Sequence, residues 1–470
     1  MPVSDPLKAA EVMVSALRGA LEPGKGALGK TRRYLRGHHD LPYMPRGAKA
    51  EYITLARRSI TNWLPLISDT YAKVLFVEGY RAANQKDNDA AWKHWQANKL
   101  DARQTVAHRG ALDYGVGYVE VLPSDGASPS IKPLHPTRVW AEYEDEDDEY
   151  PHRYIIRRGK DEAGDSLYRL VDDTNVYEIV KPDTGAPRLV ATSEHEMGVA
   201  PLVRFRERLD DESLGIIRPL IPIQDRINES VFALMIALQY ASFRQRWATG
   251  MEIPTDDQKT LPDGTANPNY GKPVESFKAA IDRLWVTDNP EAKFGDFAQT
   301  EVSGHINTYE STVRTLAGIA QTSPHVLLGD LVNLSADALA AAEAATQRKA
   351  AEYETLFGEC WEQVLSLAAI AAGEDVPSED AEVRWRDSEA RSMAQTVDAL
   401  GKMVSLLQVP AEGAWARIPG VTQTELEEWR RMRAANADGM ATLAAAIDRQ
   451  TASTTQPPAA PAVPAEPPAA

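Results

Sequence analysis

The stretch from Ser335 to Ala372 constrains the fold more than any other part of the sequence. It opens with Ser335 and Asp337, a hydroxyl and an acid suited to a helix start, and has no Gly or Pro before Gly358. Good helix formers fill its first half, and a helix of this length would span roughly 55 Å. Apolar residues recur on one side at spacings of three and four. The pattern predicts a long amphipathic helix joining separate parts of the chain; the alternative is a long helix inside an ordinary all-α domain.

The composition limits the kind of protein that this chain can be. With 470 residues, 43% of them hydrophobic, it is long enough for more than one domain with a real core. Its one cysteine, Cys360, rules out an internal disulfide and fits a reducing compartment. We expect no signal peptide and no membrane segment, because the longest apolar run, Val231–Ala241, is too short to cross a bilayer. The net charge of −17 argues against tight nucleic-acid binding, but it is compatible with DNA that slides past.

Helical spacing dominates residues 5–115 and gives way to strand spacing after them. Leu7–Leu21 is amphipathic, and Arg57–Val77 is predicted as a helix that Pro65 bends or resets. Around Tyr114–Val121 the apolar period changes from about four to two, which predicts strands. Further short strands are predicted at Arg153–Arg157, Leu167–Val171, Val176–Val180, Arg188–Ala191 and Val203–Arg206. Residues 116–213 should therefore form a β-rich module.

Two further helices flank a long insertion. Gln224–Trp247 is apolar on nearly all sides, so we expect other helices to bury it. These helices could belong to the same chain or to neighbouring copies of it. Residues 251–298 include a run rich in Pro, Gly, Asn and Asp that predicts an exposed loop, with a strand at Leu284–Val286 after it. Thr300–Ala320 is predicted as a helix and Thr322–Leu334 as a loop.

The chain after the long helix is predicted to be helical and then disordered. Glu382–Trp385 predicts a strand that returns to the sheet, and Ser388–Leu407 and Thr424–Ala445 predict helices. Thr451–Ala470 is rich in Ala and Pro and nearly uncharged, so we expect it to be disordered and partly polyproline.

One motif suggests nucleotide binding. Gly24–Thr31 fits the phosphate-binding pattern G-x-x-x-x-G-K-[ST], in which backbone amides and a lysine hold phosphates and a hydroxyl binds Mg²⁺. That chemistry needs a strand before the loop and a solid helix after it. Here Ala9–Leu21 has helical spacing, and Gly37 and Pro42 interrupt the following segment. We favour a flexible basic turn between two helices, and a P-loop nucleotide-binding enzyme stays as an alternative.

The other motif matches favour ordinary surface structure. Asp183-Thr184-Gly185 resembles an aspartic-protease triplet but lies between two predicted strands, where a hairpin turn fits better. The acidic run Glu142–Glu149 lacks the alternating ligands and Gly of a calcium loop and fits a solvated strand connection. His38-His39-Asp40 has no partner at metal-ligand spacing. We expect no catalytic residues, no metal and no cofactor.

Several stretches, taken together, resemble the portal proteins of tailed bacteriophages, in particular the shorter kind found in long-tailed phages. The resemblance covers about residues 28–370, and its specificity lies in the order and spacing of its pieces. They are Tyr34–Pro42, Asn62-Trp63, Val77–Tyr80, Trp95–Asp101, His108, Ala111–Gly115, Pro201–Phe205, Gln224–Asn228, Lys293–Phe297, Ser323–Gly329, Asn333–Leu339 and Phe357–Glu362.

The resemblance implies an α+β fold, predominantly helical, divided into the parts of a portal subunit. In that scheme a wing comprises residues 1–213, helical over 1–115 and β-rich over 116–213, together with a return over 374–386. A first stem helix lies in 214–250, a clip in 251–298 and a second stem helix in 299–320. A tunnel loop occupies 321–334, a spine helix 335–373 and crown helices 387–450, before the disordered tail at 451–470.

The resemblance also implies functional residues for these parts. Residues of the tunnel loop would line a DNA channel: Pro324, His325, Leu328, Gly329, Asp330 and Asn333. Stem residues would lie at the interface between subunits: Ile227, Val231, Met235 and Leu238. Clip residues would face the packaging motor and the tail connector: Pro262, Asp263, Asn267, Tyr270 and Trp285.

The expected function is that of a portal subunit. Portal subunits form a homo-dodecameric ring at one capsid vertex, through which double-stranded DNA enters and leaves. The implied partners are further copies of the chain, the major capsid protein, the terminase large subunit, a head–tail connector or adaptor, and DNA passing without sequence preference. The expected location is the virion, after assembly in the host cytoplasm. Besides the nucleotide-binding enzyme, another head–tail adaptor or a minor capsid protein stays as an alternative.

Overall fold

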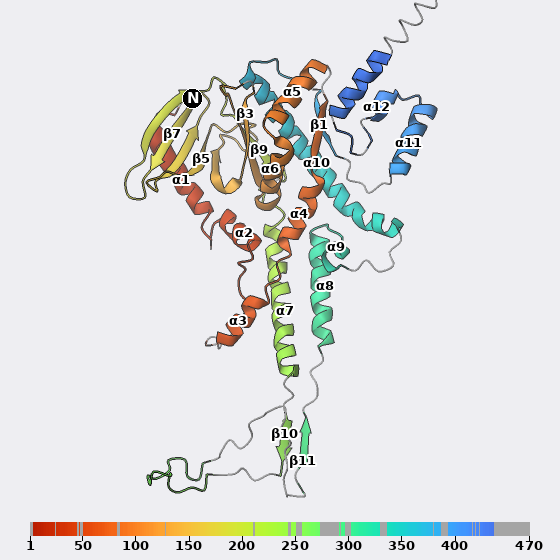
Figure 1. Cartoon of the computed structure of the whole chain (residues 1–470). Coiled ribbons are helices and arrows are strands. Elements are labelled where there is room, and N and C mark those ends of the chain that lie inside the picture. Colours follow the sequence, from red (N-terminus) through yellow and green to blue (C-terminus); the bar gives the residue numbers. More distant parts are fainter. Residues whose placement is uncertain are drawn as a thin grey trace, which may run out of the picture. The chain divides into compact units, whose positions relative to one another are not determined.

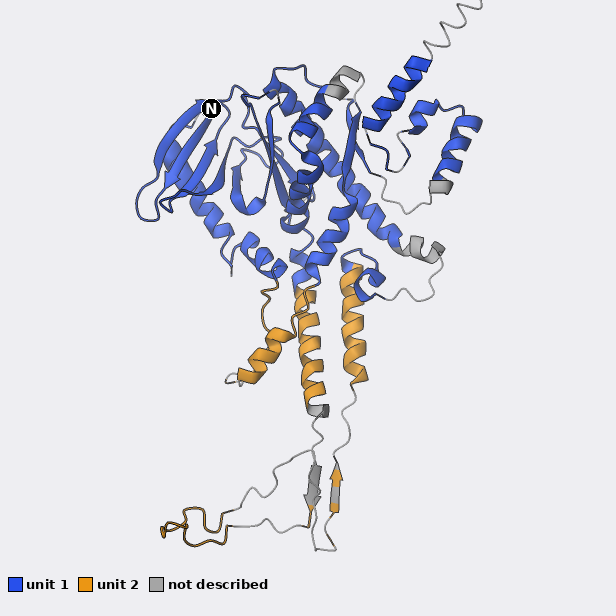
Figure 2. Ribbon diagram, in the orientation of Figure 1, with its two compact units in different colours: residues 1–36, 63–221, 319–470 blue, residues 37–62, 222–318 orange. Residues whose placement is uncertain are grey.

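The computed structural model describes residues 3–436, and these residues form two compact units (Figure 2). The description leaves gaps at 24, 45–46, 48–49, 82–84, 127, 210–211, 243–245, 251–255, 273–290, 292, 297–301, 330–335, 379, 387–392, 416, 419 and 423. Unit 1 comprises residues 1–36, 63–221 and 319–470, and unit 2 comprises residues 37–62 and 222–318. Each unit therefore draws on separate stretches of the chain.

The described part of unit 1 contains both helices and sheets (Figure 1). Its helices are α1 (Pro6–Ala20), α2 (Ala27–Leu35), α4 (Leu64–Val74), α5 (Gln85–Ala97), α6 (Leu100–Tyr114), α9 (Pro324–Leu328), α10 (Ala336–Ala372), α11 (Met393–Leu406) and α12 (Ala411–Trp415). Short 3-10 turns lie at η1 (Pro136–Arg138) and η2 (Arg218–Leu220), and residues 424–436 are also helical. Its strands are β1 (Val77–Arg81), β2 (Val116–Leu122), β3 (Ser130–Leu134), β4 (Val139–Glu142), β5 (Arg153–Lys160), β6 (Ser166–Val171), β7 (Asn175–Lys181), β8 (Arg188–Glu194), β9 (Leu202–Arg206) and β12 (Glu382–Trp385).

The long helix α10 confirms the prediction for Ser335–Ala372. It runs for 37 residues from Ala336 to Ala372. Large side chains of its second half, Tyr353, Phe357 and Trp361, are fully buried in unit 1. The spacings of four between them place all three on the same side of the helix, as the apolar pattern predicted.

The β-rich module is built in layers. Strands β3, β2 and β9 form a three-stranded sheet in that order, and β4 to β8 form a five-stranded antiparallel sheet in sequence order. On one face of the larger sheet, Ala10 and Met13 of α1 pack with Ile155 and Leu170. A second core joins the two sheets through residues that include Tyr118, Tyr154, Val171 and Leu202. The predicted strands in 116–213 are confirmed.

Two predictions, one for residues 57–77 and one for residues 382–385, are wrong in detail. Residues 57–77 do not form one helix, since α3 (Ala50–Arg58) ends before α4 begins at Leu64. Pro65 lies in the first turn of α4, where its missing N–H costs no hydrogen bond. The end of that range, Val77, instead begins β1. This strand pairs antiparallel with β12, so 382–385 joins β1 in a sheet of its own and not the β-rich module.

Unit 2 contains α3, α7 (Ile221–Ser242), α8 (Ser303–Ile319) and a two-stranded sheet of β10 (Arg246–Thr249) and β11 (Lys293–Asp296). The helix predicted for 224–247 therefore ends too late. Trp247 lies in β10, where it pairs with Gly295. The pairing partner lies almost 50 residues further along the chain, so the local apolar pattern could not reveal the strand. The helix predicted for 300–320 corresponds to α8.

The remaining predictions concern the loop before α10, the helices after it, and two segments outside the described residues. The loop predicted for 322–334 contains the short helix α9, which is a correction, because Pro324 starts a helical turn and Gly329 ends it. Helix α11 and the helical residues 424–436 lie within two helices predicted for the region after the long helix. The strand predicted at 284–286 and the disordered tail at 451–470 lie outside the described residues.

Candidate functional site

The segment that follows α8 is fixed to the body of unit 1 before it reaches α9. The hydroxyl of Tyr71 donates hydrogen bonds to the carbonyl oxygens of Ala320 and Gln321, at 2.8 and 3.2 Å. The hydroxyl of Thr346 on α10 donates to the same Gln321 carbonyl at 3.0 Å. Gln321 itself has a φ of +54°, the left-handed region that non-glycine residues rarely adopt. Two helices thus hold one sharply turned residue, and no sequence pattern predicted this anchor.

Beyond the anchor lie residues that we expected to line a channel. Pro324 is exposed, His325 is half-buried beside the Ser323 hydroxyl at 2.7 Å, and Leu328 is half-buried. Gly329 closes α9 with a φ of +74°, and its N–H donates to the His325 carbonyl at 2.9 Å. The remaining two expected residues, 330 and 333, lie outside the described residues. The structure thus brings the described part of this set together as one short helical turn.

A buried aromatic cluster fixes α10 to α6 and β9. His108 of α6 is stacked on Phe357 with ring centroids 5.4 Å apart, and Phe205 of β9 lies edge-on to Trp361 at 5.0 Å. The Trp361 indole N–H donates to Nε2 of His108 at 2.8 Å, while Nδ1 of His108 lies 3.2 Å from the Leu75 carbonyl. Burial lowers the pKa of His108 to about 3, so the ring is neutral, with its proton on Nδ1 and its lone pair on Nε2. The sequence indicated the helix but not this cluster.

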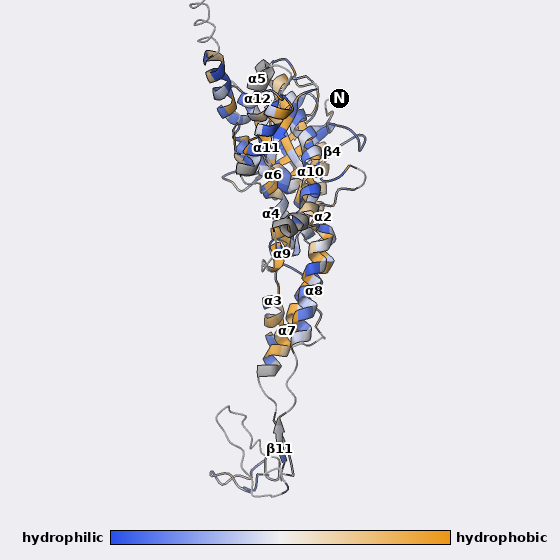
Figure 3. Cartoon of the chain, turned by 90° about the vertical axis from the view of Figure 1, so that its right-hand side faces the viewer, coloured by the Kyte–Doolittle hydropathy of each residue, from blue (hydrophilic) through white to orange (hydrophobic). Residues whose placement is uncertain are grey.

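The helices of unit 2 leave apolar side chains uncovered within one chain. Of the residues expected at a subunit interface, Ile227 is fully buried, Val231 and Met235 are half-buried, and Leu238 is 47% exposed. On α8, Ile306 is 44% exposed. Apolar and polar residues succeed one another along both helices (Figure 3). Covering large apolar side chains at this exposure with another surface lowers the free energy, because their apolar area is removed from water.

A hydrogen-bond network ties residues 37–62 to the first turns of α7 within unit 2. The Asn228 side chain is fully buried; its carbonyl accepts from the Thr61 N–H at 3.2 Å, and its amide lies 2.9 Å from Nδ1 of His39. The Gln224 amide donates to the Thr61 carbonyl at 2.7 Å and to the Asn228 carbonyl at 3.1 Å. His39, which the sequence offered only as a metal ligand without partners, thus lies in an amide network.

Residues 256–272 form an ordered loop with its own internal bonds. Asn267 is nearly buried, and its amide donates to Asp256 at 2.9 Å and to the Gln258 carbonyl at 2.8 Å. Asp263 accepts from both the N–H and the hydroxyl of Thr265, and these bonds lower its pKa. Tyr270 is 50% exposed. The expected clip residues 262, 263, 267 and 270 therefore share one loop, with Asn267 as its internal support, while 285 lies outside the described residues.

The enzyme-like motifs lie in positions without enzyme geometry. The phosphate-loop pattern begins after α1 and runs into α2, so residues 27–31 are helical and do not form the turn that we favoured. Helix α1, and not a strand, precedes the pattern, and the Thr31 hydroxyl donates back to the Ala27 carbonyl at 3.2 Å. Residues 183–185 form the turn between β7 and β8, as predicted. Among the described residues no group of three or more His, Cys, Asp or Glu side chains could hold a metal ion. The same residues contain no helix that is both long and apolar enough to cross a bilayer.

Comparison with known proteins identifies the family. The model of the family described as phage portal protein, SPP1 Gp6-like, matches residues 25–439. The portal proteins of Mycobacterium phages D29 and L5 are each 26% identical to this chain, over 390 and 391 residues; the match covers 78% of this chain and 77% of each relative. A solved structure titled "Virion of native gene transfer agent (GTA) particle" aligns at a TM-score of 0.44 and 15% identity, covering 81% of this chain and 99% of that one.

A family match over most of the chain defines the class: this is a structural component of a phage particle. More specifically, the chain belongs to the phage portal protein family of the SPP1 Gp6-like kind, and its function is that of a portal subunit. The resemblance noted from the sequence is thereby confirmed. The family match favours a portal subunit over the nucleotide-binding and adaptor alternatives.

Proposed function

We propose that this portal subunit acts as one member of a homo-dodecameric ring that surrounds a DNA channel at one capsid vertex. The observation that carries the proposal is the partial exposure of apolar side chains on both long helices of unit 2, among them Leu238 and Ile306. A ring contact between neighbouring copies would remove this apolar surface from water and would repeat identically around the ring. In such a ring the exposed apolar side chains of α7 and α8 would pack against a neighbouring copy of the chain.

The proposed parts of the subunit follow the described elements. The wing would hold α1, α2, α4 to α6 and the β-rich module, and the β1–β12 pairing supports a return of the chain to it. Helices α7 and α8 would be the stem, residues 251–298 the clip, 321–334 the tunnel loop and α10 the spine. Helices α11 and α12 and residues 424–436 would belong to the crown.

The channel role needs no catalytic residue, cofactor or metal. DNA of any sequence has to pass, so contacts of the tunnel loop would be to the backbone and the groove shape, without base readout. A net charge of −17 on every subunit suits this role, because phosphate contacts by Lys and Arg strengthen binding and would hinder sliding. The wider proposal includes docking of the terminase large subunit and a head–tail connector at the clip, contact with the major capsid protein, and assembly in the host cytoplasm before incorporation into the virion.

The stem assignment is tested by placing a charge in the apolar seam. Met235→Asp and Leu238→Asp should each prevent ring formation, because an unpaired carboxylate in an apolar contact costs several kcal/mol. Gln239→Asp is the matched control, since it adds the same charge at an exposed polar position of the same helix. Sedimentation and negative-stain images would report rings for the wild type and the control. Rings of unchanged abundance in both apolar variants would refute the assignment.

The tunnel-loop assignment is tested in packaged particles. Insertion of two glycines after Gly329, or Asp330→Arg, should leave rings intact and impair DNA packaging or retention. A photoreactive residue at position 330 should cross-link to DNA of any sequence in filled particles. If that probe labels only protein and the insertion packages normally, the segment is a simple connector and the channel lining lies elsewhere.

A further inference from the structure

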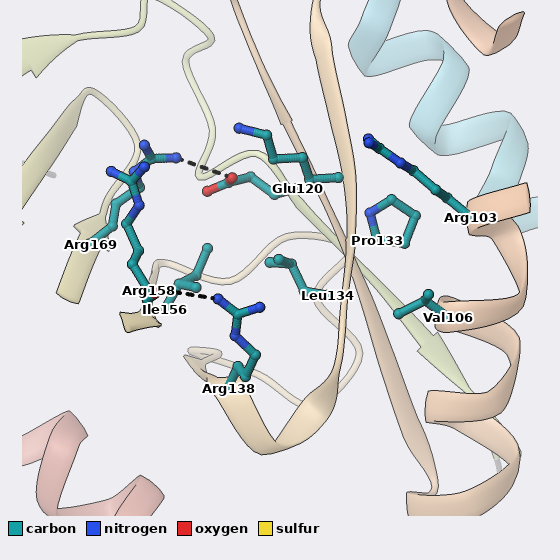
Figure 4. Close-up of a pocket in the computed structure, with 10 residues that line it drawn as sticks. Arg103, Val106, Glu120, Pro133, Leu134, Arg138, Ile156, Arg158 and Arg169 are labelled. Atoms are coloured by element: carbon teal, nitrogen blue, oxygen red, sulfur yellow. Dashed lines mark hydrogen bonds and ion pairs between the residues drawn. The ribbon is translucent and has the colours of Figure 1, made fainter. Parts of the chain in front are cut away.

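A strongly basic pocket lies between α6 and the β-rich module of unit 1, although the chain as a whole is acidic. The pocket has a volume of about 440 Å³ and is lined by five cationic side chains and one carboxylate: Arg103, Lys132, Arg138, Arg158, Arg169 and Glu120. Figure 4 shows Arg103 and Val106 of α6 on one wall and Arg158 and Arg169 on the other. We call this cavity the basic pocket.

Only part of the positive charge in the basic pocket is balanced. Arg169 pairs with Glu120 at 3.3 Å and with Glu178 at 3.0 Å, and Arg158 pairs with Glu178 at 2.9 Å. Burial raises the pKa of Glu120, which is 2% exposed, although Arg169 and Lys132 oppose the shift. The carboxylates on this side are therefore already engaged by the two arginines.

Three cations of the basic pocket stay without a carboxylate. Among the described residues, no acid lies within ion-pair distance of Arg103, Lys132 or Arg138, and all three residues are exposed. The Arg138 guanidinium donates to the carbonyl oxygens of Arg157 and Arg158, at 3.1 and 3.4 Å, which fixes its position but leaves its charge unbalanced. The pocket therefore presents a fixed excess of positive charge to an incoming anion.

The same chain carries a matching excess of negative charge. Residues 144–149, between β4 and β5, are six consecutive acids, and all six are exposed. In the part of the chain that the structure describes, none of them is paired with a cationic side chain. We call these residues the acidic loop. Its backbone is held in place, since Arg204 donates to the Glu146 carbonyl at 2.6 Å and Gln363 donates to the Glu149 carbonyl at 3.4 Å.

The two features lie on opposite edges of one sheet. In the order β3-β2-β9, Lys132, Pro133 and Leu134 of β3 line the basic pocket, whereas Arg204 of β9 holds the acidic loop. The Arg204 guanidinium also lies 3.8 Å from the ring centroid of Tyr143, at the start of the loop. The loop is thus fastened to β9, the edge strand opposite β3 in this sheet.

We propose that the acidic loop of one subunit docks in the basic pocket of the next copy of this chain. In a head-to-tail ring every copy offers one edge to one neighbour and the other edge to the other, so a single pair of complementary surfaces serves the whole ring. Such charge complementarity fixes register and speeds association. The inference rests on the proposed ring and adds the surfaces through which the wing parts of neighbouring subunits recognise one another.

The test uses two charge-reversed variants that should assemble only together. The pocket variant carries Arg103→Glu and Lys132→Glu. The loop variant carries Glu144→Lys, Glu146→Lys, Asp147→Lys and Glu149→Lys. Each variant alone should reach half-assembly only at a protein concentration at least about tenfold above that of the wild type, because like charges meet at every contact. An equimolar mixture should recover mixed assemblies, since the intact loop of one variant meets the intact pocket of the other. Lys8→Glu with Arg18→Glu, two exposed positions on α1, is the control and should assemble as the wild type does.

A second measurement keeps the inference testable if a variant does not fold. Wild-type chains with light and heavy isotopes would be mixed, assembled and treated with a zero-length carbodiimide reagent. Lys132 should then be joined to carboxylates of the acidic loop in light–heavy peptide pairs. The inference would be overturned if rings form normally but give no light–heavy peptide pair. It would also be overturned if mixing the two variants does not improve assembly over either variant alone. The ring proposal stands in both cases. Cross-links from Lys132 that occur only in whole particles and lead to a different protein would also overturn it.

Discussion

The indole N–H of Trp361 donates a 2.8 Å hydrogen bond to Nε2 of His108, across 253 residues of sequence and with both side chains fully buried. The bond requires a neutral His108. Because the pKa of His108 is lowered from 6.5 to about 3, its contribution to stability is fully present above pH 6.5 and is lost as the pH falls from 6.5 toward 3. The long helix α10 thus depends on the charge state of one residue of α6.

The first prediction concerns this bond. Trp361→Phe should lower the free energy of unfolding of unit 1 by about 2–4 kcal/mol, because it leaves Nε2 of His108 as a buried acceptor without a donor and removes part of a packed ring. Thermal unfolding followed by circular dichroism would measure the loss. Trp415→Phe, at a half-buried indole paired with Trp429, should cost clearly less. Equal melting temperatures for wild type and Trp361→Phe would contradict the structural role of the bond.

The second prediction uses pH. Burial raises the pKa of Asp113 from 3.8 to about 6, although the hydrogen bond from Ser68 and the charge of Arg109 oppose the shift. A raised carboxyl pKa favours the folded state below pH 3.8, and that advantage is lost as the pH rises from 3.8 through 6. Asp113→Asn should therefore be more stable than the wild type by up to about 3 kcal/mol at pH 8, and the difference should vanish near pH 4.

Unfolding by urea at several pH values between 4 and 8 would measure this difference. Titrating groups that do not interact with Asp113 contribute equally to both proteins and cancel in the comparison. A difference between Asp113→Asn and wild type that does not change with pH would show that Asp113 is ordinary in the folded chain.

The third prediction concerns the amide network of unit 2. Asn228→Ala should leave the Thr61 N–H without its side-chain acceptor and should weaken the attachment of residues 37–62 to α7 by about 2–3 kcal/mol. Limited digestion with trypsin should then cut faster at Arg57 and Arg58, both of which are exposed. Glu229→Ala, one position along and exposed, should digest at the wild-type rate. Identical digestion of all three proteins would rule the network out as the attachment.

The fourth prediction compares two glycines. Gly329 ends α9 at a φ of +74°, so Gly329→Ala should destabilise the turn by about 1 kcal/mol through backbone strain. Gly401 lies inside α11, with no atom within 4 Å of an added Cβ, so Gly401→Ala should stabilise by about 0.5–1 kcal/mol. Hydrogen exchange of the amides around each site would give opposite changes in protection. A gain of protection around Gly329→Ala would show that the turn is not needed.

Features set by neighbouring residues could be predicted from the sequence, and features set by distant ones could not. The helix α10 was predictable because good helix formers follow Ser335 without interruption. The first residue of β1, Val77, was taken for the end of a helix, because Val74, Leu75 and Val77 continue the apolar run. The residues that pair with β1 are those of β12, some 300 positions later. The end of α7 was misplaced for the same reason, since β10 depends on β11.

The functional surfaces show the same division. The acidic loop could be recognised from the sequence as a run of acidic residues, and its prediction as a connection between two strands was correct. The basic pocket was invisible, because Arg103, Lys132 and Arg169 come from a helix and two sheets, and only the folded chain brings them together. The anchor at Gln321 was missed as well, since nothing near it in sequence indicates that Tyr71 and Thr346 donate to one carbonyl.

The pairing of β1 with β12 also has a consequence during synthesis. A ribosome adds roughly 5–20 residues per second, so about 15–60 s pass between the emergence of Arg81 and that of its partner Glu382. Throughout that interval the nascent chain carries an open strand edge beside Val77, which is fully buried in the finished unit. An unpaired edge can pair with another chain, so crowded ribosomes on one message would risk joining two unfinished subunits. Slower translation between residues 81 and 382 would lengthen this exposure and lower the yield of assembly-competent subunits. A chaperone that covers the edge would raise that yield.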